Sequence, residues 1–373
     1  MADSATVKWS WKIARIAGID IYIHATFFLL LYLVAIAYWN EQGTVGAVIA
    51  GVAYILALFC CVVLHEFGHS LTARRYGIRT RNITLLPIGG IASLEKMPDD
   101  PRQEIKVALA GPAVNFAIAI LLYLYLDFSN VPLTAQELSS PEGSFAYRVM
   151  VVNIFIGGFN LLPAFPMDGG RVLRAALATR MDHALATEKA ARIGQFLAIG
   201  LGFLGMMYNP FLVFIAIFIW FGASMENSAE QLNSILGRSS VRHAMLREFH
   251  ILSPQDTLAK AVALTLAGSQ KDFPVGTPQK LDKVLYHSDL IKGLQEKGEH
   301  ARICELPLRD ILAADINEPL GALLERLQGS SNQIIYVSDA GRIVGLLNLE
   351  NLLELVRIHQ AVESHNRGKK WQA

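Results

Sequence analysis

Long apolar runs fill most of the chain up to Met225 and predict membrane-spanning helices. A helix needs about 20 mostly apolar residues to cross the hydrocarbon core of a bilayer. Six runs approach or exceed that length, at residues 19–39, 44–72, 103–126, 146–165, 190–207 and 209–225. The pattern therefore predicts a polytopic α-helical membrane domain over residues 19–226, preceded by a cytosolic segment of residues 1–18.

A different pattern lies between the second and third runs. Residues 80–95 consist of two short apolar pieces on either side of Pro87-Ile88-Gly89-Gly90. Two apolar pieces around a Pro/Gly cluster are typical of a β-hairpin. The stretch is too short to span a bilayer, and non-helical backbone at membrane depth must be covered by protein or water. We therefore expect a membrane-associated β-hairpin.

The apolar character ends after the sixth run, and helix and strand patterns then alternate. Leu258 aligns with Leu320 and Val275 with Val337 at one and the same offset along the chain. A constant offset of this kind indicates an internal structural repeat. We expect a linker over residues 227–240, a tandem α/β repeat over residues 241–360 and a polar tail over residues 361–373.

Composition and charge agree with a membrane protein. Charged residues make up 17% of the chain, against about 25% in an ordinary soluble domain. The net charge of +1 gives no field that would attract nucleic acid. Basic residues precede the first predicted helix and follow the second and the fourth, whereas the loops after the first and third carry none. The positive-inside rule then predicts a multi-pass protein of the cell membrane with both termini in the cytosol.

The motif His65-Glu66-Phe67-Gly68-His69 stands near the end of the second apolar run. Two histidines four residues apart share one helix face, so both imidazoles can reach one zinc ion. Glu66 can take a proton from water and pass it to a leaving amine. Ionisable residues inside a membrane span are costly and usually functional, which favours a metal site over a chance match.

A catalytic zinc takes three protein ligands and keeps one open position, so the histidine pair needs a third ligand. Asp168 lies in a segment rich in proline and glycine at the same predicted depth. Its carboxylate can complete a metal site, or it can cap the helix that follows. Asn160 can donate to a developing oxyanion. Asn115 and Asn153 lie within apolar runs, where hydrogen bonding between helices is the alternative to a role in the site.

These motifs together resemble the site-2 protease family of intramembrane zinc metalloproteases. The resemblance covers about residues 15–225 and rests on His65-Glu66-x-x-His69, Gly111-Pro112-x-x-Asn115 and Asn160-x-x-Pro163-x-x-x-x-Asp168-Gly169. It implies one catalytic Zn²⁺ with His65, His69 and Asp168 as its ligands. It also implies that Glu66 is the catalytic acid/base and that Asn160 contacts the substrate or the transition state.

The resemblance implies a substrate class as well. The expected hairpin matches the family's membrane-associated β element, thought to receive substrate as an added strand, and Leu85, Leu86 and Asn153 are the candidate substrate contacts. Pairing with a sheet edge replaces the backbone hydrogen bonds that a helical substrate loses on unwinding. The implied reaction is hydrolysis of a peptide bond in or near a transmembrane segment, that is, regulated intramembrane proteolysis. The partner would be a single-span protein such as a membrane-held transcription factor or an anti-sigma factor, within the lipid bilayer.

The C-terminal repeat resembles a tandem pair of cystathionine-β-synthase (CBS) domains, which implies adenine nucleotide binding and a homodimer. The signature Gly-h-h-Thr-x-x-Asp (h hydrophobic) reads Lys283-Val-Leu-Tyr-His-Ser-Asp289 and then Gly345-Leu-Leu-Asn-Leu-Glu-Asn351. Asp289 is the candidate ribose contact, and the second aspartate is replaced by Asn351. Because CBS pairs also regulate ion carriers, a CBS-regulated membrane transporter or channel is the alternative function.

Overall fold

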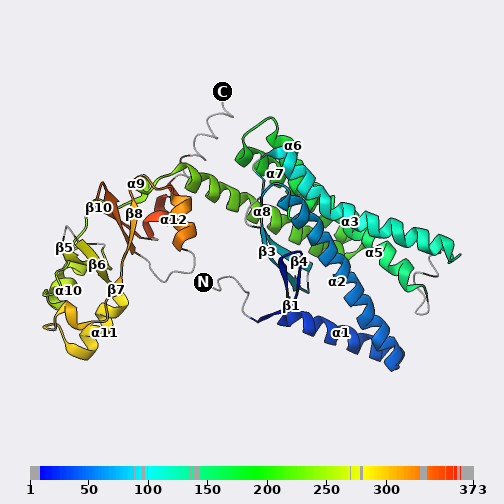
Figure 1. Ribbon diagram of the computed structural model, residues 1–373, viewed down its shortest axis with the longest axis horizontal. Coiled ribbons are helices and arrows are strands. Elements are labelled where there is room, and N and C mark those ends of the chain that lie inside the picture. The colour runs from blue at the N-terminus through cyan, green and yellow to red at the C-terminus, as the bar shows by residue number, and fades with distance from the viewer. Residues whose placement is uncertain are drawn as a thin grey trace. The chain divides into compact units, whose positions relative to one another are not determined.

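Figure 1 shows the computed structural model of the chain, coloured from blue at the N-terminus to red at the C-terminus. The structure describes residues 9–87, 89–94, 97–98, 100–134, 137, 143–268, 270–277, 280–327, 334–348, 350–355, 357–358 and 362. The chain divides into two compact units, Met1–Glu230 and Gln231–Ala373. The expected polar tail lies, apart from residue 362, outside the described residues.

Within the described residues, the first unit contains six long or medium apolar helices and one short helix between them. These are α1 (Ala25–Gln42), α2 (Val45–Arg74), α3 (Pro101–Phe128), α5 (Phe145–Asn160), α6 (Asp168–Ala178), α7 (His183–Tyr208) and α8 (Pro210–Arg238). Among the described residues, four of these helices, α2, α3, α7 and α8, are long and apolar enough to cross a membrane. The polytopic helical class is thus confirmed, while α1 and α5 are shorter than the apolar runs that predicted them.

The shortening of α1 has a clear cause in the sequence. Residues 19–24 were expected to begin the first membrane helix, but they form strand β2 (Ile19–His24). Ile19 and Ile21 alternate with polar Asp20 and are buried, which is the period-2 pattern of a strand with one covered face. A hydropathy average over the length of a membrane span does not separate this pattern from a helix, so the expected start of the span was wrong.

The expected hairpin is half of a larger sheet. Strands β3 (Thr80–Leu86) and β4 (Gly89–Leu94) pair as predicted, and β1 (Ser10–Ile16) and β2 extend the sheet in the order β1-β2-β3-β4. The pairing of β2 with β3 is parallel, because α1 and α2 carry the chain back between them. In the described sheet β4 is an edge strand, and its neighbour outside the sheet is α2.

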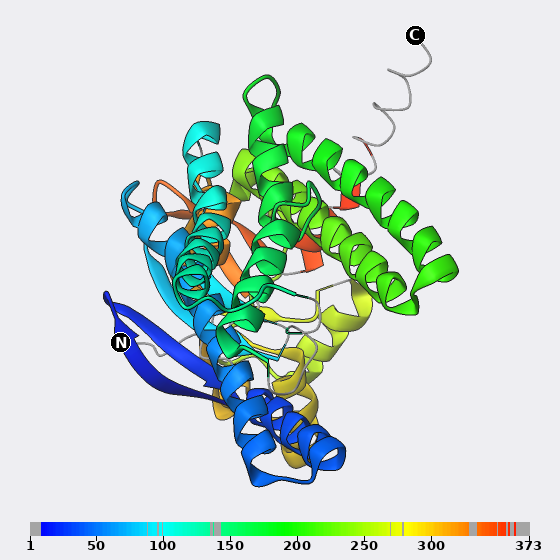
Figure 2. The same cartoon turned by 90° about the vertical axis from the view of Figure 1, so that its right-hand side faces the viewer.

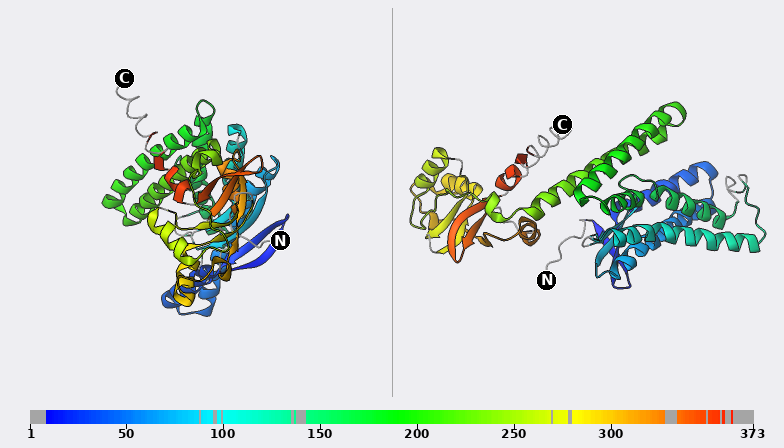
Figure 3. Two further views of the ribbon diagram at one scale, coloured as in Figure 1. Left: turned by 90° about the vertical axis from the view of Figure 1, so that its left-hand side faces the viewer. Right: turned by 90° about the horizontal axis from the view of Figure 1, so that it is seen from above.

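A second helical layer consists of α7 and α8. The two helices lie side by side and antiparallel, joined at Asn209 (Figures 2 and 3). Ala198 of α7 and Ile219 of α8 are buried in one cluster with Ala164 and Met167. The pair therefore packs directly on the turn that precedes α6.

The second unit is built from two copies of one α/β motif. Phe273 pairs with Leu285 in one sheet, and Ile335 pairs with Leu347 in the other, at the offset that the sequence predicts. The described elements are α9 (Val241–Ala244), α10 (Leu258–Ala267), β5 (Phe273–Thr277), β6 (Lys280–Leu285), α11 (His287–Lys297), a 3₁₀ turn (Ile303–Glu305), β7 (Arg309–Asp310), β8 (Leu312–Asp315), α12 (Leu320–Leu327), β9 (Ile334–Asp339) and β10 (Arg342–Asn348). The repeat expected from the sequence is confirmed by this register. Helix α8 continues through Arg238 and so occupies most of the residues expected to form a linker.

Candidate metal centre and active site

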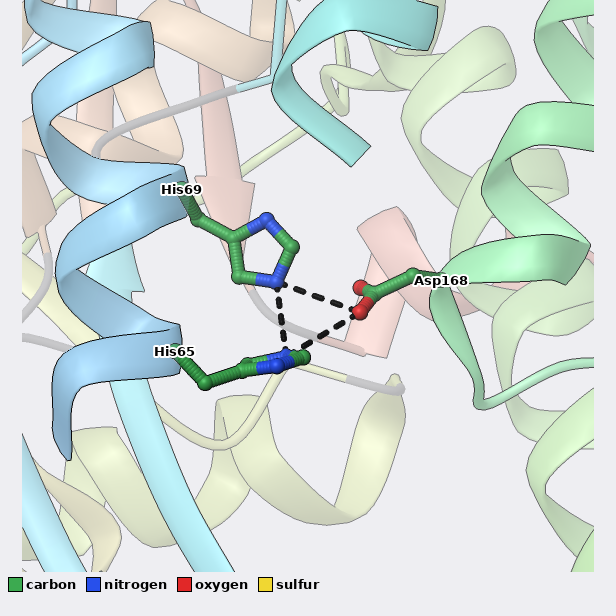
Figure 4. A group of neighbouring side chains, drawn as sticks. All are labelled: His65, His69 and Asp168. Carbon is green, nitrogen blue, oxygen red and sulfur yellow. Dashed lines mark hydrogen bonds and ion pairs between the residues drawn. The ribbon is translucent and has the colours of Figure 1, made fainter. Parts of the chain in front are cut away.

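Helix α2 presents both histidines of the motif on one face. His65 and His69 are only 5% and 6% exposed, and their ring centroids lie 4.7 Å apart. One turn of helix separates them, so both imidazoles project in the same direction, toward Asp168 (Figure 4). The two histidines therefore share one helix face, as their spacing of four residues predicts.

Asp168 reaches the histidines from the tight turn before α6. It is the first residue of that helix, and the N-cap position belongs to Met167. A side chain at Gly169 would overlap the carbonyl oxygen of Leu162, and one at Gly170 would lie 2.6 Å from the carbonyl carbon of Ala164. The absence of side chains at these two glycines thus allows the backbone of the turn to pack directly against the first residues of α6. The alternative of Asp168 as the N-cap does not hold in this geometry.

Three ligand atoms converge at one point. Nε2 of His65 and Nε2 of His69 are 3.0 Å apart. Oδ2 of Asp168 lies 3.2 Å from the first nitrogen and 3.1 Å from the second. In a tetrahedral zinc site with bonds of about 2.0–2.1 Å, ligand atoms lie about 3.3 Å apart. The triangle therefore has nearly the dimensions that zinc requires, with side chains of the right chemical type.

The hydrogen bonds of Nδ1, on the far side of each imidazole, indicate which ring nitrogen carries the proton. Nδ1 of His69 lies 2.8 Å from the backbone carbonyl oxygen of Val107, which can only accept a hydrogen bond, so Nδ1 carries the proton. Nδ1 of His65 lies 2.5 Å from Oδ1 of Asn115. The Asn115 amide nitrogen donates to Oδ1 of Asn153, so its oxygen is the atom that accepts from His65. In the neutral imidazole of each ring, Nε2 is then the unprotonated atom, and it faces the centre.

The consequence is three hydrogen-bond acceptors that face one another in a buried place. Two lone pairs and a carboxylate oxygen at about 3 Å repel each other unless a cation or a proton lies between them. Metal-ligating histidines characteristically donate their other ring N–H to a carbonyl or amide oxygen, as both do here. The residues present thus fit a zinc ion, and His65, His69 and Asp168 are the residues that can hold it.

Glu66 lies beside this centre and against the sheet. A methyl group at Gly90 of β4 would lie 3.1 Å from Cγ of Glu66 and 3.7 Å from its Oε1. The carboxylate is therefore next to an edge strand, and Gly90 leaves the room that it occupies. A carboxylate in this position, next in sequence to a metal ligand, is suited to proton transfer.

Other predicted site residues make contacts of their own. Asn160 donates from Nδ2 to the carbonyl oxygen of Ile156, 3.0 Å away in its own helix. Leu85 is 4% exposed and packs with Phe27 and Phe59, so its side chain belongs to the core and does not face a substrate. Leu86 is half-buried at the end of β3.

Asn153 and Asp289 are the remaining predicted site residues. Asn153 is 1% exposed and donates to the carbonyl oxygen of Val149 and to Sγ of Cys61. Its Oδ1 accepts from Asn115, which in turn accepts from Nδ1 of His65, so its side chain is part of the hydrogen-bond chain behind that ring. Asp289 belongs to the second unit, at the start of α11.

The sequence prediction gave no catalytic role to Val107 or to Asn115 as partners of the histidines. A backbone carbonyl has no signature in a sequence, so the contact of Val107 could not be found there. Gly111 is part of a motif in the sequence, but only the structure shows why a glycine is required there. A side chain at Gly111 would overlap Nε2 of His69 and lie 2.6 Å from Nε2 of His65.

The close approach of Gly111 leads to a prediction. Glycine to alanine in a helix is ordinarily stabilising, by about 1 kcal/mol. We expect Gly111→Ala to fold but to lose most of its zinc, because the added methyl group occupies the space of the imidazole nitrogens. Metal analysis of the purified protein measures the loss. The matched control is Gly158→Ala in α5, where the added methyl group meets open space; equal zinc content in both variants would contradict the geometry.

Comparison with known proteins agrees with this site. The model of peptidase family M50 matches residues 53–145 and 132–205. A zinc metalloprotease of Methanocaldococcus jannaschii is 29% identical over 359 residues, which are 96% of this chain and 99% of that protein. The solved site-2 protease of the same organism is 36% identical and covers 59% of this chain and 95% of its own, with a TM-score of 0.44. The CBS domain of a bacterial CNNM/CorC family Mg²⁺ transporter, solved with ATP, is 22% identical and covers 35% of this chain and 96% of its own, with a TM-score of 0.31.

The zinc metalloprotease relative matched over almost the whole chain, the family match across α2 to α7, and the His-His-Asp group at the centre all agree. The chain therefore belongs to peptidase family M50, the site-2 proteases, and is an intramembrane zinc metallopeptidase.

Proposed function

We propose that His65, His69 and Asp168 bind the catalytic zinc and that Glu66 moves the proton during hydrolysis of a membrane-spanning substrate. The observation that carries this proposal is the convergence of three acceptor atoms within 3.2 Å, with both ring N–H groups engaged on the far side. Such a centre fits a zinc ion, and its three ligands leave one position open for water or substrate.

The residues of the chain then have separate tasks. Zinc, when bound, supplies a Lewis acid that polarises the scissile carbonyl and makes water more acidic. Glu66 takes the proton of the attacking water and returns it to the leaving amine. Val107 and Asn115 hold the two rings in the orientation and tautomer that leave Nε2 free. Asn160 is the candidate donor to the developing oxyanion, once its side chain leaves the carbonyl of Ile156.

The depth of the centre supports cleavage near the cytosolic surface. His69 is five residues before Arg74, the last residue of α2, which is about 7 Å at 1.5 Å per residue. Arginine at the end of a span marks the cytosolic side under the positive-inside rule. We therefore place both termini in the cytosol and the scissile bond just inside the inner surface of the bilayer.

The edge of β4 is the proposed substrate-binding element. A helical substrate hides its carbonyl groups in its own hydrogen bonds, so it must be extended before hydrolysis. The edge strand offers backbone groups to pair with the extended segment, and Glu66 lies against that strand at Gly90. This assigns binding to β4, in place of Leu85 and Leu86 on the interior strand β3.

The substrate class follows from this geometry. A segment that enters a bilayer-embedded site and pairs with β4 must be extended and mostly apolar. We propose a single-span membrane protein whose cleavage releases a regulator, such as a membrane-held transcription factor or an anti-sigma factor. The rival function, a transporter or channel, would use the same buried ionisable groups as an ion path.

The substitution Glu66→Gln separates these functions. We expect zinc content to stay at the wild-type level and cleavage of a co-expressed single-span substrate to fall by about 10²-fold or more, because the proton acceptor is lost. Metal analysis and immunoblotting of the substrate measure the two quantities. Asp168→Ala is the companion variant and should lose zinc together with activity. Ion flux through reconstituted wild-type protein without any cleavage would favour the transporter.

Strand addition at β4 can be tested by photo-crosslinking. A benzoylphenylalanine at the exposed position Ser93 of β4 should trap substrate in the inactive Glu66→Gln background. The same probe at Trp11, which is 55% exposed on β1 at the other edge of the sheet, is the matched control. Equal crosslinking from both edges, or none from Ser93, would contradict the assignment.

We further propose that the CBS-like unit binds an adenine nucleotide and modulates the protease as a homodimer. Asp289 lies in the first turn of α11, and within the described part of the chain its buried Oδ2 has no hydrogen-bond partner. Arg309 approaches that oxygen at 3.5 Å and stacks over the ring of Tyr286. A carboxylate for a ribose hydroxyl and an arginine for a phosphate are thus adjacent.

Nucleotide binding has a direct test. Titration of the full-length protein in detergent with ATP, ADP and AMP should show saturable binding that weakens about tenfold or more in Asp289→Ala. Glu296→Ala, at an exposed position of the same helix, should bind as the wild type does. Absence of saturable binding to all three nucleotides would leave the unit as a module for dimerisation alone.

A further inference from the structure

A second buried polar cluster lies in the membrane unit, apart from the metal ligands. Arg174 of α6 is 3% exposed, and its Nε donates to Oε1 of Glu104 in α3 at 2.8 Å. Its Nη1 donates to Oε1 of Glu226 in α8, also at 2.8 Å. The guanidinium group also stacks on Phe165, at 5.4 Å from the ring centroid. One side chain thus joins α6 to α3, to α8 and to the turn before α6.

Each of these contacts leads to the metal centre. Asp168 is on the same short helix as Arg174, six residues earlier. Phe165 is fully buried within the turn that delivers Asp168. Helix α8 packs closely against the same turn, since a side chain at Gly222 would lie 2.5 Å from Cδ of Pro166. Gly222 and Glu226 are one helical turn apart, so the same face of α8 holds both the turn and the arginine.

Helix α3 carries the other half of the centre. Glu104 is followed on the buried side of α3 by Val107, Gly111 and Asn115. Val107 accepts from His69, Asn115 accepts from His65, and Gly111 lies directly against both rings. The contact between Arg174 and Glu104 therefore joins the helix that bears Asp168 to the helix that orients the two histidines.

We propose that Arg174 is a positioning residue that sets the distance between Asp168 and the histidine pair. The proposal rests on the assignment of these three residues as zinc ligands. Arg174 touches none of them, and it acts by fixing α6 against α3 and α8. An arginine suits this task because its planar group donates in two directions and stacks on an aromatic ring at once. A lysine keeps the charge but is a single point donor that cannot maintain all three contacts.

The test is Arg174→Lys in the full-length protein, purified in detergent. We expect zinc affinity, measured by competition with a chelator, to fall about tenfold, a loss typical of residues that support metal ligands. The absorption spectrum of the Co²⁺-substituted protein should change as well, because Asp168 no longer holds its place. When Arg174→Lys does not fold, Glu226→Gln decides in its place, with a smaller loss of affinity, about threefold.

A control separates positioning from general loss of stability. Leu126→Ala removes a fully buried side chain in α3, about four helical turns beyond Gly111 and so about 22 Å away along the helix. It should lower the melting temperature and leave zinc affinity and the Co²⁺ spectrum unchanged. The inference is overturned if Arg174→Lys, or Glu226→Gln in its place, keeps wild-type zinc affinity and spectrum, or behaves as Leu126→Ala does at an equal loss of melting temperature.

The proposed ligand assignment fails independently of this inference. Asp168→Ala tests it, since a missing ligand should remove zinc altogether. Normal zinc affinity in Asp168→Ala would refute the ligand set itself. Normal zinc affinity in Arg174→Lys alongside a zinc-free Asp168→Ala would refute only the role of Arg174.

Discussion

The membrane unit brings three acceptor atoms from two helices within 3.2 Å of one another, and the positions of the surrounding helices follow from this constraint. In a buried place this arrangement is unfavourable unless a cation or a proton lies between the atoms. The surrounding helices hold the three atoms at this spacing. Packing at fixed close contacts can do this, because a protein interior does not deform continuously.

Small residues create those close contacts. A side chain at Gly68 of α2 would lie 2.6 Å from the carbonyl oxygen of Ala110 in α3, so the two backbones meet where the histidines project. A side chain at Gly194 of α7 would lie 3.2 Å from Cα of Ala164, in the turn before Asp168. Helix association in membranes commonly uses small residues in this way, since lipid offers no hydrophobic drive between helices. The metal geometry is thus set by helix approach as much as by the ligands.

The sequence predicted what depends on local periodicity and missed what depends on pairing over long distances. His65 and His69 share a face because of their spacing alone, and the internal repeat of the second unit is visible as a constant offset. The parallel pairing of β2 with β3 joins segments separated by two helices, so hydropathy could not reveal it. Spacing also left Asp168 open between a ligand and a cap, because only the fold of the turn decides where its carboxylate points.

The buried stripe of α3 explains why so few polar residues suffice for this function. Glu104, Gly111 and Asn115 recur at the spacing of one helix face, so one surface meets Arg174, the imidazoles and the amide of Asn153 in succession. Polar residues in a membrane span must be satisfied by partners within the protein. Here the partners are a metal ligand, Asn153 and Arg174. The hydrogen bonds that satisfy each buried polar group therefore also fix the positions of the side chains around the metal centre. A change at Glu104, which contacts none of the three ligands, should then disturb zinc geometry through Arg174.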